Sequence, residues 1–180
     1  MNHFIRFVRS LSLAGGFFAA LLTATAVLIV CQMVFIRYML NDNTIWQTDF
    51  VTYSIVAATF IGGPYVLMTR GHVNVDVVPV YVGLRARWWL ALIAILISLA
   101  FAVVMAILTF YFWHEAWDNN WRSDSMWRAR LWIPYAAMPV GFAQLSLQYI
   151  VELLELVTGR VPPFGITGDP NEAALKEAGI

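Results

Sequence analysis

Long apolar stretches alternate with short polar connections along this chain. Four stretches lack Asp, Glu, Lys and Arg entirely, and they cover residues 10–36, 50–69, 88–113 and 131–151. A helix rises about 1.5 Å per residue and the hydrocarbon core of a bilayer is about 30 Å thick, so about 20 apolar residues are enough to cross it. The pattern predicts an all-α membrane protein with four transmembrane helices.

The connection between the second and third stretches, residues 70–85, is too short and too polar to cross a bilayer. Its valines alternate as in a strand, yet several of its apolar residues also share one helical face. An open strand edge leaves backbone groups unpaired in lipid, whereas a helix lying in the interface satisfies its own. We therefore expect a short cytoplasmic interfacial helix here.

Composition supports a single membrane domain. The 180 residues are 61% hydrophobic and 12% charged, with a formal net charge of zero. Four spans leave too little chain for a second core, so residues 1–160 are predicted to form one four-helix membrane domain. Residues 161–180, which begin Val161-Pro162-Pro163, are predicted to be a cytoplasmic tail. No run of like charge points to nucleic acid as a partner.

Basic residues predict the topology, because Lys and Arg in short connections favour the cytoplasmic side. Seven of them fall on the side of both termini and four on the other side. The seven are Arg6, Arg9, Arg70, Arg85, Arg87, Arg160 and Lys176. The four are Arg37, Arg122, Arg128 and Arg130. Both termini are therefore expected in the cytoplasm.

Small residues recur at every fourth position within the spans, which is typical of closely packed transmembrane helices. They are Gly16, Ala20 and Ala24; Ser54, Ala58 and Gly62; Ala94, Ser98, Ala102 and Ala106; and Ala137 and Gly141. Two interpretations stay open. The stripes pack the four helices against one another, or at least one of them packs against another subunit.

Reactive side chains are scarce inside the spans. His3, His72 and His114 all lie outside the uncharged stretches, so axial ligands for a membrane haem are not indicated. Zinc-protease, nucleophile-elbow and phosphate-loop motifs do not occur in the sequence. We expect neither an enzyme nor a cofactor bound by this chain.

Two charged residues flank the first hairpin of spans. Arg37 ends the first apolar stretch and Asp49 begins the second, so they could pair at the periplasmic interface. Charges close to the headgroups cost far less than charges at the bilayer centre. We interpret the two as a structural or partner contact, with ion coupling by Asp49 as the alternative.

Several short motifs follow one another along the chain. They are Arg37-Tyr38, Ile45-Trp46-Gln47-Thr48-Asp49, Phe60-Ile61-Gly62-Gly63, Arg70-Gly71-His72-Val73-Asn74-Val75-Asp76, Trp132-Ile133-Pro134-Tyr135 and Met138-Pro139-Val140-Gly141. In this order they resemble the small membrane subunit of tripartite ATP-independent periplasmic (TRAP) transporters, the DctQ-like family. Trp46 and Asp49 match its Trp-x-x-acid motif, in which the acid is more usually Glu. The resemblance covers about residues 5–157.

This resemblance implies a small permease subunit, acting as a scaffold in the bacterial inner membrane. It also implies a large TRAP membrane subunit that binds solute and sodium, and a periplasmic substrate-binding protein that delivers an organic-acid-type solute. Sodium is expected in that partner, not in this chain. Residues with expected contact or anchoring roles are Arg37, Trp46, Asp49, Gly62, His72 and Asp76. The alternatives are a standalone homo-oligomeric transporter or channel, and a membrane enzyme or cytochrome subunit.

Overall fold

The computed structural model describes residues 2–69 and 84–158, and this part of the chain is almost entirely helical. Its four long helical units are each long and apolar enough to cross a membrane. The elements are α1 (Asn2–Phe35) with the π-helical turn η1 (Ile36–Leu40), α2 (Gln47–Met68), α4 (Leu84–Asp118), and α5 (Trp132–Tyr135) followed by α6 (Ala137–Val157). The predicted all-α, four-span fold is confirmed.

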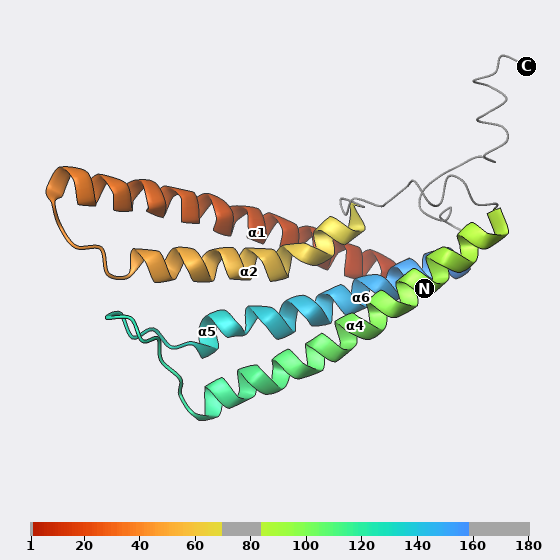
Figure 1. The fold of residues 1–180 in the computed structure, drawn as a ribbon. Helices are drawn as coiled ribbons and strands as arrows, with labels where there is room; N and C mark the ends of the chain where they lie inside the picture. The colour runs from red at the N-terminus through yellow and green to blue at the C-terminus, as the bar shows by residue number, and fades with distance from the viewer. Residues whose placement is uncertain (1, 70–83, 159–180) are drawn as a thin grey trace, which may run out of the picture.

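The four spans form one open layer in the order α1, α2, α6, α4 (Figure 1). The last span therefore lies between the second and the third. α2 packs on α1 and on α6, and α6 packs on α4, whereas α1 and α4 form the two edges of the layer. The first turns of α1 also pack on the last turns of α6, but much of the apolar surface of α1 and of α4 faces outward.

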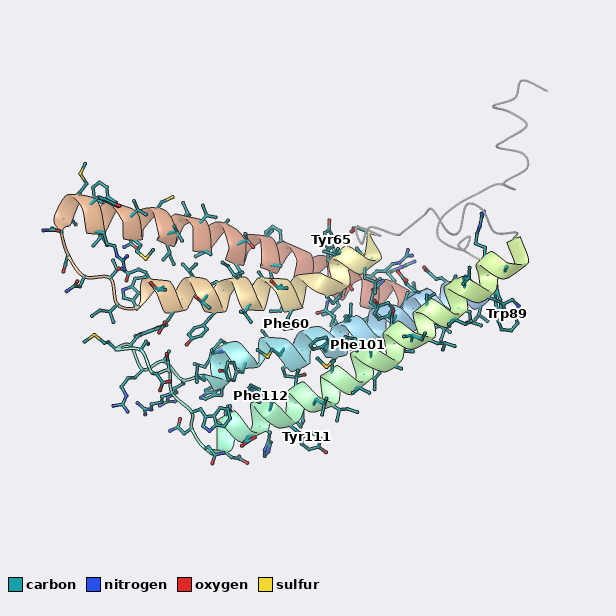
Figure 2. All side chains as sticks on the ribbon, viewed as in Figure 1. Phe60, Tyr65, Trp89, Phe101, Tyr111 and Phe112 are labelled. Atoms are coloured by element: carbon teal, nitrogen blue, oxygen red, sulfur yellow. The ribbon has the colours of Figure 1, made fainter. Side chains whose placement is uncertain are left out.

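The outer side of α4 illustrates this exposure. Trp89 and Tyr111 point away from α6 (Figure 2), and they are 58% and 68% exposed. Residues that face inward are mostly small, as at Ala91, Ala102 and Ala116. A helix with bulky apolar residues outside and alanines inside is suited to lie against lipid or another membrane helix.

Both ends of the described chain lie at the same end of the layer, which we call the terminal end. There the first turns of α1 meet the last turns of α6, and Ile5, Val8 and Val151 form a buried cluster joined by Leu147. The connections 41–46 and 119–131 lie at the opposite end, the loop end. This arrangement fits an even number of crossings.

Local chemistry explains where two helices stop or bend. The helical turn η1 ends at Asn41, whose φ of 52° is a left-handed conformation that asparagine tolerates better than most residues. α2 contains Pro64, which has no N–H to donate to the carbonyl of Phe60. The last turns of α2 bend away from its axis (Figure 1), as expected beyond an internal proline.

Two predicted segments lie outside the described residues. They are the interfacial helix between the second and third spans, which holds His72 and Asp76, and the tail 161–180. Both stay predictions.

Candidate functional site

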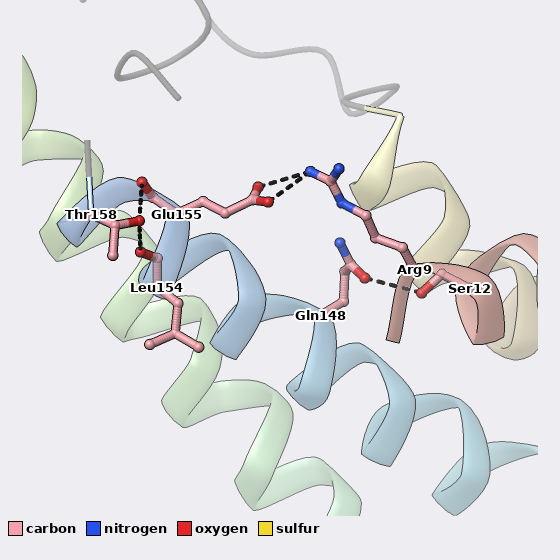
Figure 3. Close-up of polar contacts among 6 residues, drawn as sticks. All are labelled: Arg9, Ser12, Gln148, Leu154, Glu155 and Thr158. Atoms are coloured by element: carbon pink, nitrogen blue, oxygen red, sulfur yellow. Dashed lines mark hydrogen bonds and ion pairs between the residues drawn. The ribbon is translucent and has the colours of Figure 1, made fainter. Parts of the chain in front are cut away.

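Two side-chain pairs join α1 to α6 at the terminal end (Figure 3). Arg9 Nη2 donates hydrogen bonds of 2.8 and 3.0 Å to the two carboxylate oxygens of Glu155. One turn further in, the Ser12 hydroxyl donates a 3.0 Å hydrogen bond to Gln148 Oε1, and both side chains are buried. The ion pair lies where water or headgroups reach it, whereas the Ser12–Gln148 bond lies within the layer.

Sequence reasoning passed over this buried pair. The available signal was the spacing of Gln144 and Gln148, two amides at i and i+4 in an otherwise apolar span. Residues four apart share one helix face, and here that face is the buried one. Gln144 Nε2 is buried and finds no hydrogen-bond acceptor among the described residues.

Glycines set the distance between helices in the middle of the layer. A Cβ on Gly15 would lie 2.9 Å from the Ile61 carbonyl oxygen, and one on Gly16 would lie 2.4 Å from the ring of Tyr65. The α1 and α2 backbones thus approach each other over residues that lack side chains.

A second close contact joins α2 to α6. A Cβ on Gly141 would lie 2.5 Å from the carbonyl oxygen of Phe60. On the other side of α2, a Cβ on Gly62 would lie 3.1 Å from the Cβ of Ala19, so Gly62 lies at the contact between α1 and α2. α2 is therefore held closely on both sides.

Three other members of the predicted stripes face outward. Ala20, Ala24 and Ala94 are exposed, so the internal-packing interpretation is wrong for them. The buried face of α1 instead consists of Ile5, Val8, Ser12, Gly15, Ala19 and Ala26.

Asp49 occupies the loop end of the layer, in the first turn of α2. Its Oδ2 accepts hydrogen bonds from the hydroxyls of Ser125 and of Ser123, the latter at 3.4 Å. Both serines belong to residues 121–131, which fold into a short hairpin. Its backbone hydrogen bonds run from Leu131 N to Trp121 O at 3.0 Å and from Ser123 N to Ala129 O at 2.9 Å. Asp49 therefore fastens this hairpin to the start of α2.

The possible Arg37–Asp49 pair is not formed. Arg37 Nε donates a 2.9 Å hydrogen bond to the hydroxyl of Thr44, in the connection between η1 and α2. Asp49 is instead engaged by the serines of the hairpin. Arg37 thus stabilises the connection between η1 and α2, and Asp49 joins two parts of the chain that are far apart in sequence.

Tryptophan side chains at the loop end connect α4 to α5. Trp113 Nε1 donates a 3.0 Å hydrogen bond to the carbonyl of Trp132. The ring centroids of Trp117 and Trp132 lie 4.4 Å apart. Trp46 packs edge-on against Phe50 and stays 38% exposed. Such rings suit the level where apolar chain meets polar headgroups.

Comparison with known proteins agrees with this architecture. Residues 26–159, more than half of the chain, match the family described as tripartite ATP-independent periplasmic transporters, DctQ component. The chain is also 25% identical over 166 residues to the C4-dicarboxylate TRAP transporter small permease protein DctQ of Vibrio cholerae serotype O1. That match covers 81% of this chain and 72% of the Vibrio protein. The chain belongs to the DctQ family of TRAP transporter components, and it is a small permease subunit, not an enzyme.

Proposed function

We propose that this subunit is the scaffold of a sodium-coupled importer for an organic-acid-type solute. A large membrane subunit binds solute and sodium, a periplasmic binding protein delivers the solute, and the present chain holds the large subunit in the inner membrane. The family description names a tripartite, periplasmic system, and the name of the Vibrio relative refers to C4-dicarboxylates. Both support this assignment.

The open helix layer is the observation that carries the proposal. A transporter that works alone typically has broken helices that meet around a site at the membrane midplane. Here α4 lies at one edge of the layer, packed on α5 and α6, and α1 at the other edge leaves much of its apolar surface uncovered. Phe17 and Leu28 on α1 are 75% and 69% exposed, and Ile97 on α4 is 66% exposed. Such broad apolar edges suit a subunit whose packing continues onto a second membrane protein.

The contacts between the helices support the proposal that this subunit keeps one shape during transport. Glycine contacts hold α2 on both sides, and the buried Ser12–Gln148 hydrogen bond ties α1 to α6. A scaffold must keep its shape while its partner moves, and close backbone packing between helices favours one arrangement over many.

Orientation follows from the basic residues. With both termini in the cytoplasm, the terminal end faces inward, and Asp49 with its hairpin faces the periplasm. The Arg9–Glu155 pair then lies at the cytoplasmic headgroups.

A second candidate is a homo-oligomeric transporter or channel. The exposed edges of α1 and α4 favour it to the extent that copies of this chain could cover them. In that case the chain alone would move a solute.

Transport by purified components tests the proposal. Proteoliposomes containing this chain and its large subunit should take up a radiolabelled C4-dicarboxylate only with the binding protein outside and an inward sodium gradient. Vesicles with this chain alone should take up none. Uptake by the chain alone would establish the second candidate, and uptake unchanged when potassium replaces sodium would refute sodium coupling.

A further inference from the structure

α6 carries a buried amide for which the described residues supply no acceptor. The Gln144 side chain is 7% exposed, and its Nε2 group makes no hydrogen bond within the described part of the chain. Gln148, one turn further along the same face, already accepts the Ser12 hydroxyl through its Oε1. Burial of an amide without a hydrogen bond lowers stability. The Gln144 amide therefore points to a bound polar group that is not part of the chain.

A carbonyl of α2 lies at the same place. A Cβ on Gly15 would lie 2.9 Å from Ile61 O and 3.2 Å from Gln144 Nε2, so both polar atoms lie close to one point on α1. Because Gly15 has no side chain, that point is not covered by a methyl group. A carbonyl oxygen has two lone pairs, so Ile61 O can accept a second hydrogen bond beside the one in its helix.

The bend of α2 supplies a second acceptor. Pro64 has no N–H, so the carbonyl of Phe60 lacks the donor that it would have in a regular helix. This carbonyl oxygen lies against Gly141, which precedes Gln144 by one turn of α6. Ordered water is one of the groups that satisfy carbonyls freed by proline in transmembrane helices.

The direction of the two helices brings donor and acceptor toward each other. α2 and α6 both run from the loop end to the terminal end (Figure 1). Carbonyls point toward the C-terminus of their helix, whereas side chains lean toward its N-terminus. The Phe60 carbonyl therefore points toward the level of Gln144, and the Gln144 side chain leans back toward Phe60.

We propose that Gln144 binds one buried water molecule, which donates hydrogen bonds to the α2 carbonyls of Phe60 and Ile61. The water accepts from Gln144 Nε2, which gives it the three hydrogen bonds typical of a buried water. An anion would face the carbonyl oxygens and a cation would face the amide N–H groups, so a neutral molecule that both donates and accepts fits best. The water ties α6 to the bend of α2, and Gln144 is its positioning residue.

The first test looks for the water in the unaltered protein. The full chain, labelled with nitrogen-15 glutamine and placed in nanodiscs, is examined by nuclear magnetic resonance for contacts between side-chain amides and water. The signal of Gln144 is assigned by its loss in Gln144→Met. This amide should show a nuclear Overhauser effect to a long-lived water. Its absence would overturn the inference, whether or not any variant folds.

The second test asks whether the water serves the bend. Gln144→Met keeps most of the side-chain length but removes the N–H donors, and it should lower the melting temperature by about 2–4 °C or more. Gln32→Met makes the same change at an exposed amide of α1 and should leave the melting temperature unchanged. Pro64→Ala returns an N–H donor to the Phe60 carbonyl, so in that background Gln144→Met should cost less than it does alone.

The combined results separate the possible roles of Gln144. A smaller loss in the Pro64→Ala background without a water contact would indicate a direct amide–carbonyl bond and would overturn the bound water. Equal losses in the two backgrounds would show that the water does not serve the freed carbonyl, and would also overturn the inference. None of these measurements involves solute or a partner, so the proposed function is tested separately.

Discussion

Replacing Gly141 with alanine should push α6 away from α2. The new Cβ would lie 2.5 Å from the Phe60 carbonyl oxygen, 2.7 Å from its carbonyl carbon and 2.8 Å from its Cβ. Carbon and carbonyl oxygen approach to about 3.3 Å even in favourable contacts, so the two backbones must separate by several tenths of an ångström. Overpacking of this kind costs about 1–3 kcal/mol. Backbone atoms cannot turn aside as the end of a flexible side chain could.

Gly63→Ala is the matched control, since a Cβ at Gly63 meets no atom within 4 Å outside its own helix and chain neighbours. Both substitutions bring the same gain in helix propensity. Gly63 precedes Pro64, and a Cβ before proline is disfavoured in a helix, so the control itself is expected to lose some stability. The further loss in Gly141→Ala measures the contact with Phe60.

Thermal unfolding of the purified variants in one detergent gives the comparison, with the intrinsic fluorescence of the eight tryptophans as the signal. A domain of this size loses about 2–4 °C in melting temperature per kcal/mol. Gly141→Ala should therefore melt several degrees below the wild type and below Gly63→Ala. Equal melting temperatures for the two variants would refute the close α2–α6 contact.

Three further outcomes are expected. Arg9→Gln should cost about 1–3 kcal/mol in the same melting assay, because the Arg9 side chain is 49% exposed but that of Glu155 only 13%, so the change leaves a largely buried carboxylate without its ion pair; an unchanged melting temperature would contradict this. Ser12→Ala should cost about 1 kcal/mol, and adding Gln148→Leu should restore part of it, since removing both partners leaves no buried acceptor unpaired; additive losses would argue against the bond. Asp49→Ala should lower assembly or uptake in proteoliposomes without changing solute preference, and an altered preference with intact assembly would place Asp49 near the solute.

Hydropathy alone located the four spans, because burial in lipid demands uncharged residues over a fixed length. It placed the helix ends less well. The second apolar stretch begins at residue 50, whereas α2 begins at Gln47, and the third ends at residue 113, whereas α4 continues to Asp118. Charged and polar residues near the headgroups do not stop a helix, so an apolar window underestimates helix length.

The order of the helices could not be read from the chain. Small residues at Gly16, Gly62 and Gly141 indicated contacts, and the structure places all three between helices. The same spacing at Ala20 and Ala24 gave no contact, because periodicity predicts which residues share a face but not which face is covered.

The role of Asp49 also depended on tertiary structure. Arg37, the basic residue closest to it in sequence, was the obvious candidate for its partner. The structure instead brings Ser123 and Ser125, more than 70 residues away, onto its carboxylate. A pairing over such a distance in sequence leaves no local pattern for sequence analysis to detect.

The central claim is that this open layer is completed by a large membrane subunit. Its most direct test is native mass spectrometry of the tagged chain, purified in mild detergent from cells that produce the whole transporter. The account predicts an assembly of this chain with one much larger multi-helix membrane protein in equal numbers. An assembly made only of copies of this chain would contradict it.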